Sequence, residues 1–388
     1  MYILFDTITI ILLAALFFFL IIQLVYYWIF LAQPYYYLKK IKNNKITFSH
    51  SQPPVSIIIY ARNEPENLQS FLPSILEQNY PEYEVIVAND DFTGDSEGVL
   101  KRFQIQHKHL YYTYIPQGTK NISRKKLGLT LGIKAAKYDT LLFTEADSHP
   151  VSADWITCMT RHLNDKKTIV VGFSALEKCN TLKHRYAVFD YYFANLQMIA
   201  MALLKIPYGV NGRNLVYRKE YFDSQKGYSK YRYLQMGEDD LFVNEIATKE
   251  NMAVELSPES IIYAQWNEMS DWKYTKIDRA ITQHFYKKTP VILWRIELWS
   301  RFFFMASCLV CIFYNFWNIL LFLSAITAFI CRLFSQLFVI NKTANCLKLE
   351  KFYFLFPFFD IMQPIVNIYF YIYRLFEGKT NYVWKYEK

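Results

Sequence analysis

Acidic side chains follow three predicted β-strands at the points where those strands end. The clusters lie at 61–64 (ARNE), 89–91 (NDD) and 145–148 (EADS). In an open α/β sheet the carboxyl ends of the strands meet at one edge, where ligands bind. Carboxylates gathered there repel one another unless a cation or hydrogen-bond donors lie among them. Taken singly, each cluster is equally consistent with an ordinary loop or a helix cap.

A divalent cation is the occupant that these side chains favour together. They offer oxygen ligands without an attendant set of His and Cys, which suits Mg²⁺ or Mn²⁺. Mg²⁺ is usually held by one or two carboxylates plus substrate phosphates, so the implied ligand is a diphosphate. The sequence contains no GxxxxGK[ST] loop and no GxGxxG motif, which excludes a P-loop site and disfavours a dinucleotide oxidoreductase. The basic run 123–126 (SRKK) either supplies charge to the phosphates or begins a solvated helix.

A further acidic run lies at 236–242 (MGEDDLF). Sugar transfer with inversion needs one carboxylate to remove a proton from the acceptor hydroxyl, opposite the departing phosphate. One acid of this run could take that role. The alternative is a helix amino-terminus that attracts acids through its dipole.

Alternating strands and helices position these clusters between about 48 and 299. Short runs rich in β-branched residues alternate with amphipathic stretches, which predicts an α/β fold with a mainly parallel sheet. The predicted helices are 64–76 and 124–136. The predicted strands are 55–60, 83–89, 110–115 and 140–144.

Two uncharged runs, 7–38 and 302–331, are each long enough to cross a hydrocarbon core as a helix. They explain much of a composition that is 53% hydrophobic and only 20% charged. The first run has no basic n-region and no small-residue cleavage pattern, so we expect a retained anchor and not a signal peptide. The positive-inside rule places the residues after it in the cytoplasm, because four lysines follow: Lys39, Lys40, Lys42 and Lys45.

The carboxy-terminal third is expected to add further spans, giving three or four in all. Residues 302–340 form either a tight helix pair around 315–318 or one long tilted helix, and a pair requires a polar partner for Arg332. The segment 352–373 is interrupted by two prolines and Asp360, so it either spans or turns back. A cytoplasmic tail is favoured by Lys379, Lys385 and Lys388.

The net charge is +9, and several of the basic residues flank apolar runs, where we expect them to face anionic lipid headgroups. The basic residues are scattered and form no recognised nucleic-acid module, so we expect no nucleic acid partner.

From about 53 to 287 the motifs resemble, in order, those of the family 2 inverting glycosyltransferases with a GT-A fold, of the membrane-anchored bacterial type. Residues 55–64 (VSIIIYARNE) look like the opening strand and its Asn-Glu turn, which implies nucleotide contacts by Ala61 and Glu64. The stretch 85–96 (VIVANDDFTGDS) is similar to the second-strand motif and puts Asp90 at the place of the acid that binds uracil. The family's lysine before the metal motif falls at Lys125, with Lys126 close enough to exchange roles.

Residues 144–150 (TEADSHP) are similar to the Thr-Asp-Ala-Asp form of the DXD motif. Asp147 matches, and Glu145 replaces the first acid. A longer carboxylate still reaches a metal-bound water. The resemblance therefore implies that Asp147 and Glu145 bind Mg²⁺ or Mn²⁺ together with the diphosphate.

Two more segments complete the resemblance, and a third matches in part. Residues 209–218 (GVNGRNLVYR) resemble the Gly-rich acceptor-side segment, which implies acceptor contacts by Asn211, Gly212 and Asn214. In 237–240 (GEDD), similar to a Gly-Glu-Asp motif, Glu238 lies on the acceptor side, Asp239 is the expected general base and Asp240 is the runner-up. Residues 276–280 (KIDRA) sit where many members carry Gln-x-x-Arg-Trp. Only Arg279 of that motif is present, where it would bind the diphosphate, and the missing Gln and Trp weigh against processive polymer synthesis.

Together these expectations predict a domain organisation and an activity. A GT-A, Rossmann-like nucleotide-diphosphosugar transferase domain at 53–287 follows an anchor at 1–38 and a basic linker at 39–52. An interfacial helix at 288–301 and a membrane region at 302–388 come after it. A UDP-sugar would donate a hexosyl or N-acetylhexosaminyl group, with inversion, to a lipid-linked or nascent glycan acceptor at the cytoplasmic face of the cell (inner) membrane.

The alternative is a catalytically silent subunit that binds a nucleotide or glycan within a membrane glycan-synthesis complex. It is motivated by the departures from the family motifs at 145, 276 and 280. Partner subunits of such a complex, membrane lipid and the acceptor are the expected partners.

Overall fold

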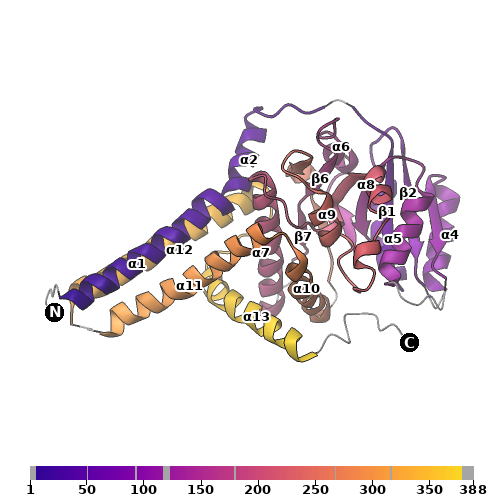
Figure 1. Ribbon diagram of the computed structural model, residues 1–388. Coiled ribbons are helices and arrows are strands. Elements are labelled where there is room, and N and C mark those ends of the chain that lie inside the picture. The colour runs from indigo at the N-terminus through magenta and orange to yellow at the C-terminus, as the bar shows by residue number, and fades with distance from the viewer. Residues whose placement is uncertain are drawn as a thin grey trace.

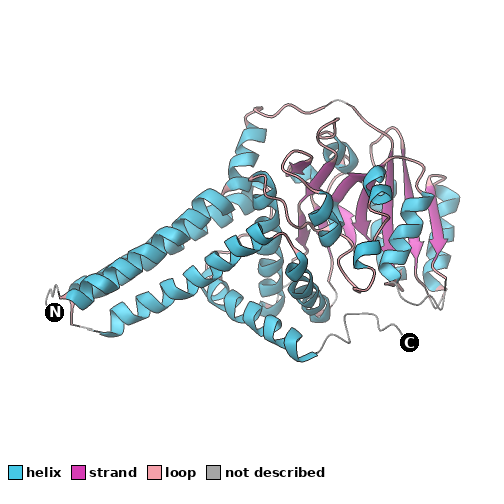
Figure 2. Cartoon of the chain, in the orientation of Figure 1, coloured by secondary structure: helices cyan, strands magenta, loops and turns pink. Residues whose placement is uncertain are grey.

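The computed structural model describes residues 6–49, 51–91, 94–116, 123–178, 181–266, 268–314 and 317–377. Long helices project from one side of an α/β domain, and the first described helix begins near the tip of this projection (Figure 1). The strands lie together in the α/β domain, away from the long helices (Figure 2). The arrangement confirms an α/β domain next to apolar helices.

A seven-stranded mixed sheet with the order β3-β2-β1-β4-β8-β6-β9 forms the centre of the domain. β1 runs parallel to β2 and β4, whereas β8 runs antiparallel to β4 and β6. The acid clusters at 61–64, 89–91 and 145–148 therefore meet at the carboxyl edge of three adjacent parallel strands. The strands are β1 (Val55–Ala61), β2 (Tyr83–Asn89), β3 (Leu110–Tyr114), β4 (Thr140–Glu145), β6 (Ile169–Gly172), β8 (Leu215–Arg218) and β9 (Met252–Glu255).

Helices cover both faces of this sheet. Ile57 of β1 packs in one cluster with Leu68 of α3, whereas the next residue, Ile58, packs in another with Ile133 of α5. This alternation follows from the period of two in a strand. The helices of the domain are α3 (Pro65–Leu76), α4 (Asp95–Gln106), α5 (Arg124–Ala135), α6 (Trp155–Thr160), α7 (Leu182–Leu203), α8 (Lys219–Ser224), α9 (Asp240–Ile246) and α10 (Met269–Thr282).

Short elements complete the domain. A three-stranded sheet joins β5 (Ser148–Pro150), β10 (Ile262–Ala264) and β7 (Ser174–Leu176) in the order β5-β10-β7. The described residues also form the 3₁₀ turns η2 (Gly212–Asn214), η3 (Ser229–Tyr231), η4 (Pro258–Ser260) and η5 (Gln283–Phe285).

Among the described residues, three helical segments are long and apolar enough to cross a membrane. The first, Thr7–Lys42, joins α1 (Thr7–Val25), the π-helical turn η1 (Tyr26–Leu31) and α2 (Gln33–Lys42). The others are α11 (Lys288–Tyr314) and α12 (Ile319–Cys346). For 302–340 the helix pair is therefore right and the single tilted helix is wrong. The three lysines that favour a cytoplasmic tail, Lys379, Lys385 and Lys388, lie outside the described residues.

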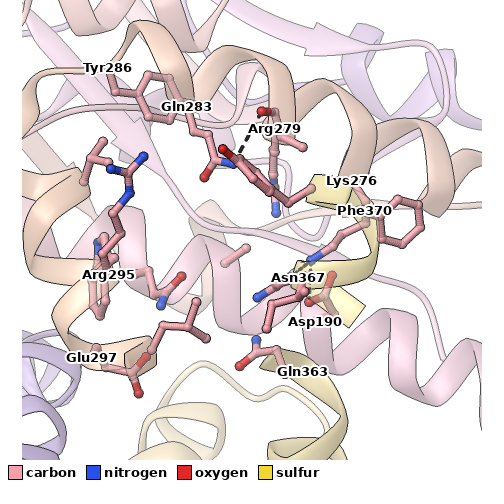
Figure 3. Close-up of a pocket in the computed structure, with 18 of the residues that line it drawn as sticks. Asp190, Lys276, Arg279, Gln283, Tyr286, Arg295, Glu297, Gln363, Asn367 and Phe370 are labelled. Carbon is pink, nitrogen blue, oxygen red and sulfur yellow. Dashed lines mark hydrogen bonds and ion pairs between the residues drawn. The ribbon is translucent and has the colours of Figure 1, made fainter. Parts of the chain in front are cut away.

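α11 runs without a break through the segment 288–301, which the sequence predicts as an interfacial helix, and on into the apolar bundle. The last described helix, α13 (Phe356–Glu377), packs against α10 of the domain. A cavity of about 540 Å³ lies where α7, α10, α11 and α13 come together (Figure 3).

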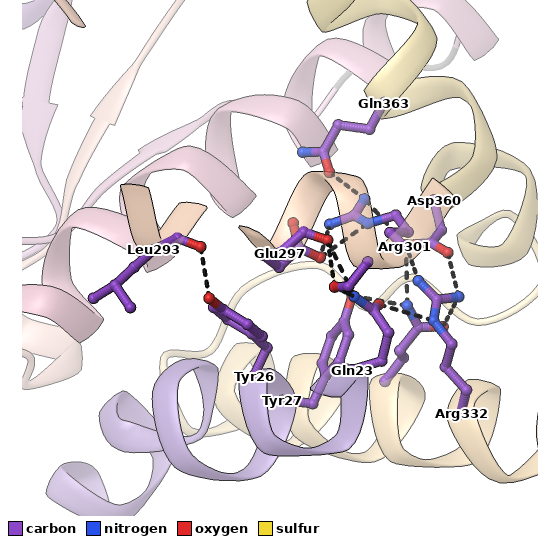
Figure 4. A network of polar contacts seen from close by, with 11 residues as sticks. Gln23, Tyr26, Tyr27, Leu293, Glu297, Arg301, Arg332, Asp360 and Gln363 are labelled. Atoms are coloured by element: carbon purple, nitrogen blue, oxygen red, sulfur yellow. Dashed lines mark hydrogen bonds and ion pairs between the residues drawn. The ribbon is translucent and has the colours of Figure 1, made fainter. Parts of the chain in front are cut away.

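A network of buried polar side chains ties the apolar helices to one another (Figure 4). Arg332 of α12 lies 2.7 Å from Asp360 of α13 and donates to Gln23 of α1 at 3.0 Å. Arg301 of α11 pairs with Glu297 at 2.6 Å and with Asp360 at 3.3 Å. Arg332 thus has the polar partner that a helix pair requires, and each charge in the network is balanced by another.

Replacing Asp360 with Leu is expected to lower the stability of the protein by about 3 kcal/mol, because it leaves Arg332 buried without its acid and Arg301 with only one. Thermal unfolding of the detergent-purified protein would measure the loss. Lys348→Gln, which removes an exposed charge 3.7 Å from Glu259, serves as the control. Equal melting temperatures for the two variants would show that the network does not hold the helices together.

Candidate active site

Lys125 lies among the acidic clusters. Its Nζ is 2.6 Å from Glu145 Oε1, at the end of β4, and 2.8 Å from Glu238 Oε1, just before α9. Burial lowers the pKa of Lys125, but the Glu145 and Glu238 carboxylates outweigh burial and hold it well above its usual value. One charged lysine therefore joins the DXD-like motif to the acidic run at 237–240.

Lys126 points to a different part of the protein. It donates hydrogen bonds of 2.7–2.8 Å to three backbone carbonyls that precede Gly237, and burial lowers its pKa to about 8. Of the two lysines that the sequence leaves open, Lys125 faces the acids. Lys126 instead fixes the loop that leads into the acidic run, through the carbonyls of Tyr231, Leu234 and Met236.

Arg213 lies between the two carboxylates of the DXD-like motif. Its Nη2 is 2.5 Å from Glu145 Oε2 and 2.7 Å from Asp147 Oδ2, and its Nε donates to Asp147 Oδ1 at 3.2 Å. Asn211 caps η2 by accepting a hydrogen bond from the Arg213 backbone N–H at 3.1 Å. The sequence reasoning missed Arg213. The sequence did offer a signal, because the Gly-rich segment 209–218 contains an arginine and the acids at the sheet edge require a positive charge.

A divalent cation would have to share its oxygens with this guanidinium. Asp147 and Glu145 are ligands of the kind that Mg²⁺ and Mn²⁺ take, and substrate phosphates would complete the shell. Within the part of the chain that the structure describes, no group of three or more His, Cys, Asp or Glu is arranged to hold a metal. The pair fits an ion that binds together with a diphosphate, provided that Arg213 moves aside.

Asp239 is the least restrained carboxylate of the acidic run. Its side chain lies against the backbone of Gly212, where a Cβ on residue 212 would overlap the carboxylate. No hydrogen bond to the Asp239 side chain is found among the described residues. Burial raises its pKa to about 8, with Lys125 opposing this shift and Glu238 adding to it.

Asp240, the runner-up, is held by hydrogen bonds. The Tyr286 hydroxyl donates to Oδ2, and the Leu241 backbone N–H donates to Oδ1 at 2.7 Å. Burial raises its pKa, whereas the bonds from Thr282 and Tyr286 lower it. These contacts favour Asp239 over Asp240 as the group that accepts a proton.

Asp90, at the end of β2, is paired inside the protein. Arg124 Nε donates to its Oδ1 at 2.8 Å, and the Tyr60 hydroxyl donates to Oδ2 at 2.6 Å. Burial raises the pKa of Asp90, but these donors outweigh it and hold the pKa below its usual value. The Asp90 backbone N–H also donates to the Ala61 carbonyl at 2.7 Å, which joins the ends of β1 and β2.

Glu64 lies immediately before α3. Its Oε2 accepts a hydrogen bond from Asn67 at 3.1 Å, and burial raises its pKa to about 7 against the effect of that bond. Asp147, Glu145 and Arg213 also act on this pKa, so Glu64 belongs to the same electrostatic group.

Two of the remaining predicted residues, Asn211 and Arg279, lie next to Tyr191 of α7. Asn211 Nδ2 donates to the Tyr191 hydroxyl at 2.6 Å, and the Arg279 guanidinium lies 5.5 Å from the centre of the Tyr191 ring. Asn214 is fully buried. Its amide accepts a hydrogen bond from Trp155 Nε1 and donates to the carbonyls of Phe173 and Ser260.

Asp278 is a second residue that the sequence reasoning did not single out. It precedes Arg279 in α10, and burial raises its pKa to about 7, with Glu238 adding to the shift and Lys125 opposing it. The carboxylate therefore belongs to the electrostatic group around Lys125. The sequence signal for Asp278 was its position next to Arg279, the one residue of 276–280 that matches the family motif.

Residues 56–224 match the family model described as Glycosyl transferase family 2. A curated relative, the poly-beta-1,6-N-acetyl-D-glucosamine synthase of Staphylococcus epidermidis, is 26% identical over 119 residues. That alignment covers 29% of this chain and 27% of the relative, so the chain matches about a quarter of the relative's length.

Two solved structures are similar to the chain. The mannosyltransferase PcManGT from Pyrobaculum calidifontis, in complex with GDP-Man and Mn²⁺, is similar over 94% of this chain and 100% of that chain, with a TM-score of 0.52 and 16% identity. S. aureus TarS 1–349 in complex with UDP-GlcNAc is similar over 81% of this chain and 89% of that chain, with a TM-score of 0.40 and 14% identity. The family match and the likeness to PcManGT confirm the predicted GT-A fold.

The raised pKa of Asp239 predicts how stability depends on pH. The unfolded chain ionises this group near pH ~4 and the folded protein only near 8, so folding takes up a proton between these values. Stability linked to Asp239 is therefore fully present below pH ~4 and is lost as the pH rises towards 8.

The melting temperature of the wild type should consequently fall more steeply from pH 5 to 8 than that of Asp239→Asn. Asp165→Asn, at an exposed position, is the matched control and should keep the wild-type slope. Parallel melting curves for the wild type and Asp239→Asn would contradict the raised pKa.

Proposed function

Because the chain belongs to glycosyl transferase family 2, we propose that it transfers a sugar, with inversion, from a UDP-sugar to a lipid-linked or glycan acceptor at the membrane surface. One observation carries the proposal. Lys125 joins Glu145 of the DXD-like motif to Glu238 of the acidic run, although these residues lie far apart in the sequence. Groups for the leaving diphosphate and a candidate base therefore lie within one site.

The donor's diphosphate would be held at Asp147 and Glu145 by Mg²⁺ or Mn²⁺. When bound, such an ion stabilises the charge that develops on the departing diphosphate. Arg213, once displaced from the carboxylates, presents a planar set of donors that matches phosphate oxygens. Lys125 supplies a second positive charge at the same edge of the sheet. Mn²⁺ in PcManGT, a protein of the same fold, supports this part of the proposal.

Asp239 would take the proton of the acceptor hydroxyl. Its raised pKa suits a general base, because a base works best with a pKa near the working pH. The missing side chain at Gly212 lets the backbone of the acceptor-side segment approach this carboxylate closely. A single displacement inverts the anomeric carbon and needs no nucleophile from the protein.

The nucleoside would lie at the ends of β1 and β2. Ala61, Glu64 and Asp90 are at that edge, and the Asp90 carboxylate is oriented by Tyr60 and Arg124. The lysines at the end of α2 are exposed where the first apolar segment ends, which supports a catalytic domain on the cytoplasmic side.

One observation favours a second candidate, a catalytically silent subunit that binds a nucleotide or a glycan. Arg213 and Lys125 already neutralise Glu145, and Arg213 also pairs with Asp147. A site that is balanced in this way has no need of an ion. Turnover distinguishes the two candidates.

UDP release from UDP-sugars in the presence of Mn²⁺, measured on the detergent-purified protein, tests the proposed activity. Asp239→Asn should lower the rate by about 10²- to 10⁴-fold, because it removes the base. Asp165→Asn should leave the rate unchanged. Undiminished turnover in Asp239→Asn would refute the assignment of the base, and nucleotide binding without turnover of any donor would favour the silent subunit.

Metal binding tests the role of Arg213 without any need for activity. Arg213→Gln should tighten Mn²⁺ binding in the absence of donor by about tenfold, or ~1.4 kcal/mol, because the two carboxylates lose the cation that competes for them. Electron paramagnetic resonance of free Mn²⁺ measures the affinity. Asp147→Asn should abolish the gain when combined with Arg213→Gln. An unchanged affinity in Arg213→Gln alone would show that the guanidinium does not compete with the metal.

A further inference from the structure

The cavity between the glycosyltransferase domain and the apolar helices has two different ends. Trp299 on α11 and Tyr371 on α13 are 57% and 47% exposed, and both lie on helices with apolar outer surfaces. Tyr208 and Tyr286, also in the lining, are buried. The cavity therefore leads from an aromatic rim on the apolar helices into the interior of the domain.

One residue at the inner end contacts the acidic run of the proposed active site. The Tyr286 hydroxyl, which lines the cavity, donates a hydrogen bond to Asp240, the neighbour of the proposed base Asp239. Gly209 of the acceptor-side segment lies against both Tyr286 and Asp240. A molecule that entered from the rim would thus meet the acidic run from the side of the membrane helices.

The wall carries an excess of positive charge. It contains four cationic side chains, Lys276, Arg279, Arg295 and Arg301, and two acidic ones, Asp190 and Glu297. Lys276 pairs with Asp190 at 3.0 Å and Arg301 with Glu297 at 2.6 Å. Within the described ranges no carboxylate pairs with Arg279 or Arg295, and Figure 3 shows both arginines at the wall.

A ligand for this cavity must satisfy both features. Two arginines without acids suit a phosphate, which guanidinium groups bind through paired hydrogen bonds. An exposed rim of Trp299, Ile368 and Tyr371 suits a hydrocarbon chain at the membrane interface. A free oligosaccharide has neither the charge nor the chain. The volume is within the range of sites that hold compact ligands.

We propose that this cavity binds the acceptor as a phosphate-linked lipid, with the phosphate between Arg279 and Arg295 and the chain leaving past Trp299 into the bilayer. The inference rests on the proposed function, because it specifies the acceptor. Arg279 then serves the acceptor's phosphate and not the donor's diphosphate.

The sugar carried by that phosphate would extend inward, past Tyr286, towards Asp239. Its hydroxyl oxygen forms the new bond to the donor's anomeric carbon as the bond from that carbon to the diphosphate breaks. UDP leaves with the electron pair, and Asp239 takes the hydroxyl proton.

Photolabelling of the full-length protein in dodecyl maltoside tests the assignment. The probe is dodecyl phosphate with a diazirine at the end of its chain, and mass spectrometry locates the adducts. We expect adducts at 294–301 and 368–371, and we expect Arg279→Gln and Arg295→Gln each to lower labelling by about tenfold. Arg295→Lys should restore part of it. Lys288→Gln, an exposed cation on the same helix outside the cavity, should leave labelling unchanged.

Competition identifies the group that is recognised. Unlabelled dodecyl phosphate should prevent labelling, whereas dodecanol, inorganic phosphate and a β-linked N-acetylglucosamine oligomer should not. Labelling that survives both arginine substitutions, or adducts outside the cavity, would refute the proposal. Displacement by inorganic phosphate alone would indicate a site for a free anion, and displacement by the oligomer alone a site for a glycan. Either result would overturn the lipid assignment.

Two readouts separate this inference from the proposed function. Labelling needs no donor, so labelling without UDP release contradicts the transferase proposal and leaves the lipid site standing. UDP release together with unchanged labelling of the arginine variants contradicts the lipid site and leaves the transferase proposal standing. Arg295 is exposed, so its variant should retain the wild-type melting temperature even if Arg279→Gln, which removes a contact with Tyr191, does not.

Discussion

Charge balance at the carboxyl edge of the sheet is the constraint on which the site depends. Carboxylates from three strand ends and from the run at 237–240 are crowded where water is scarce, and each must be paired or protonated. Lys125 and Arg213 together hold the pKa of Glu145 below its usual value despite its burial. Among the described residues, Asp239 has no such partner in contact, and its pKa rises. The same crowding thus keeps Glu145 charged and raises the pKa of Asp239, which are the two properties that the proposed transfer requires.

The same requirement operates among the apolar helices, with different residues. Arg301 and Arg332 are balanced there by Glu297 and Asp360. Arg332 also donates a hydrogen bond to Gln23, so the network holds helices from both ends of the chain. Glu297 and Arg301 also line the cavity below the domain. α11 therefore takes part both in the polar network and in the wall of the cavity. The same side chains thus connect the apolar helices with the α/β domain.

The first four strands of the central sheet could be predicted to within one residue at each end, because each is a run rich in β-branched or aromatic residues and three of them are followed by a polar cluster. β6, β8 and β9 are only four residues long, and so short a run is difficult to assign to a strand from the sequence alone. Arg213 was missed because its partner Asp147 is 66 residues away in sequence, and only the fold brings them together. Lys125 and Lys126 could not be separated, since adjacent residues of a helix point about 100° apart and the sequence does not show which one faces the acids.

The unbroken course of α11 has a mechanical consequence. A helix of 27 residues is a rod of about 40 Å, longer than the hydrocarbon layer it would cross. A helix of this length accommodates a thinner or thicker bilayer by changing its tilt. Because one end of α11 forms a wall of the cavity, a change in tilt alters the width of that opening. For the proposed acceptor site, lipid composition would then influence which acceptors fit.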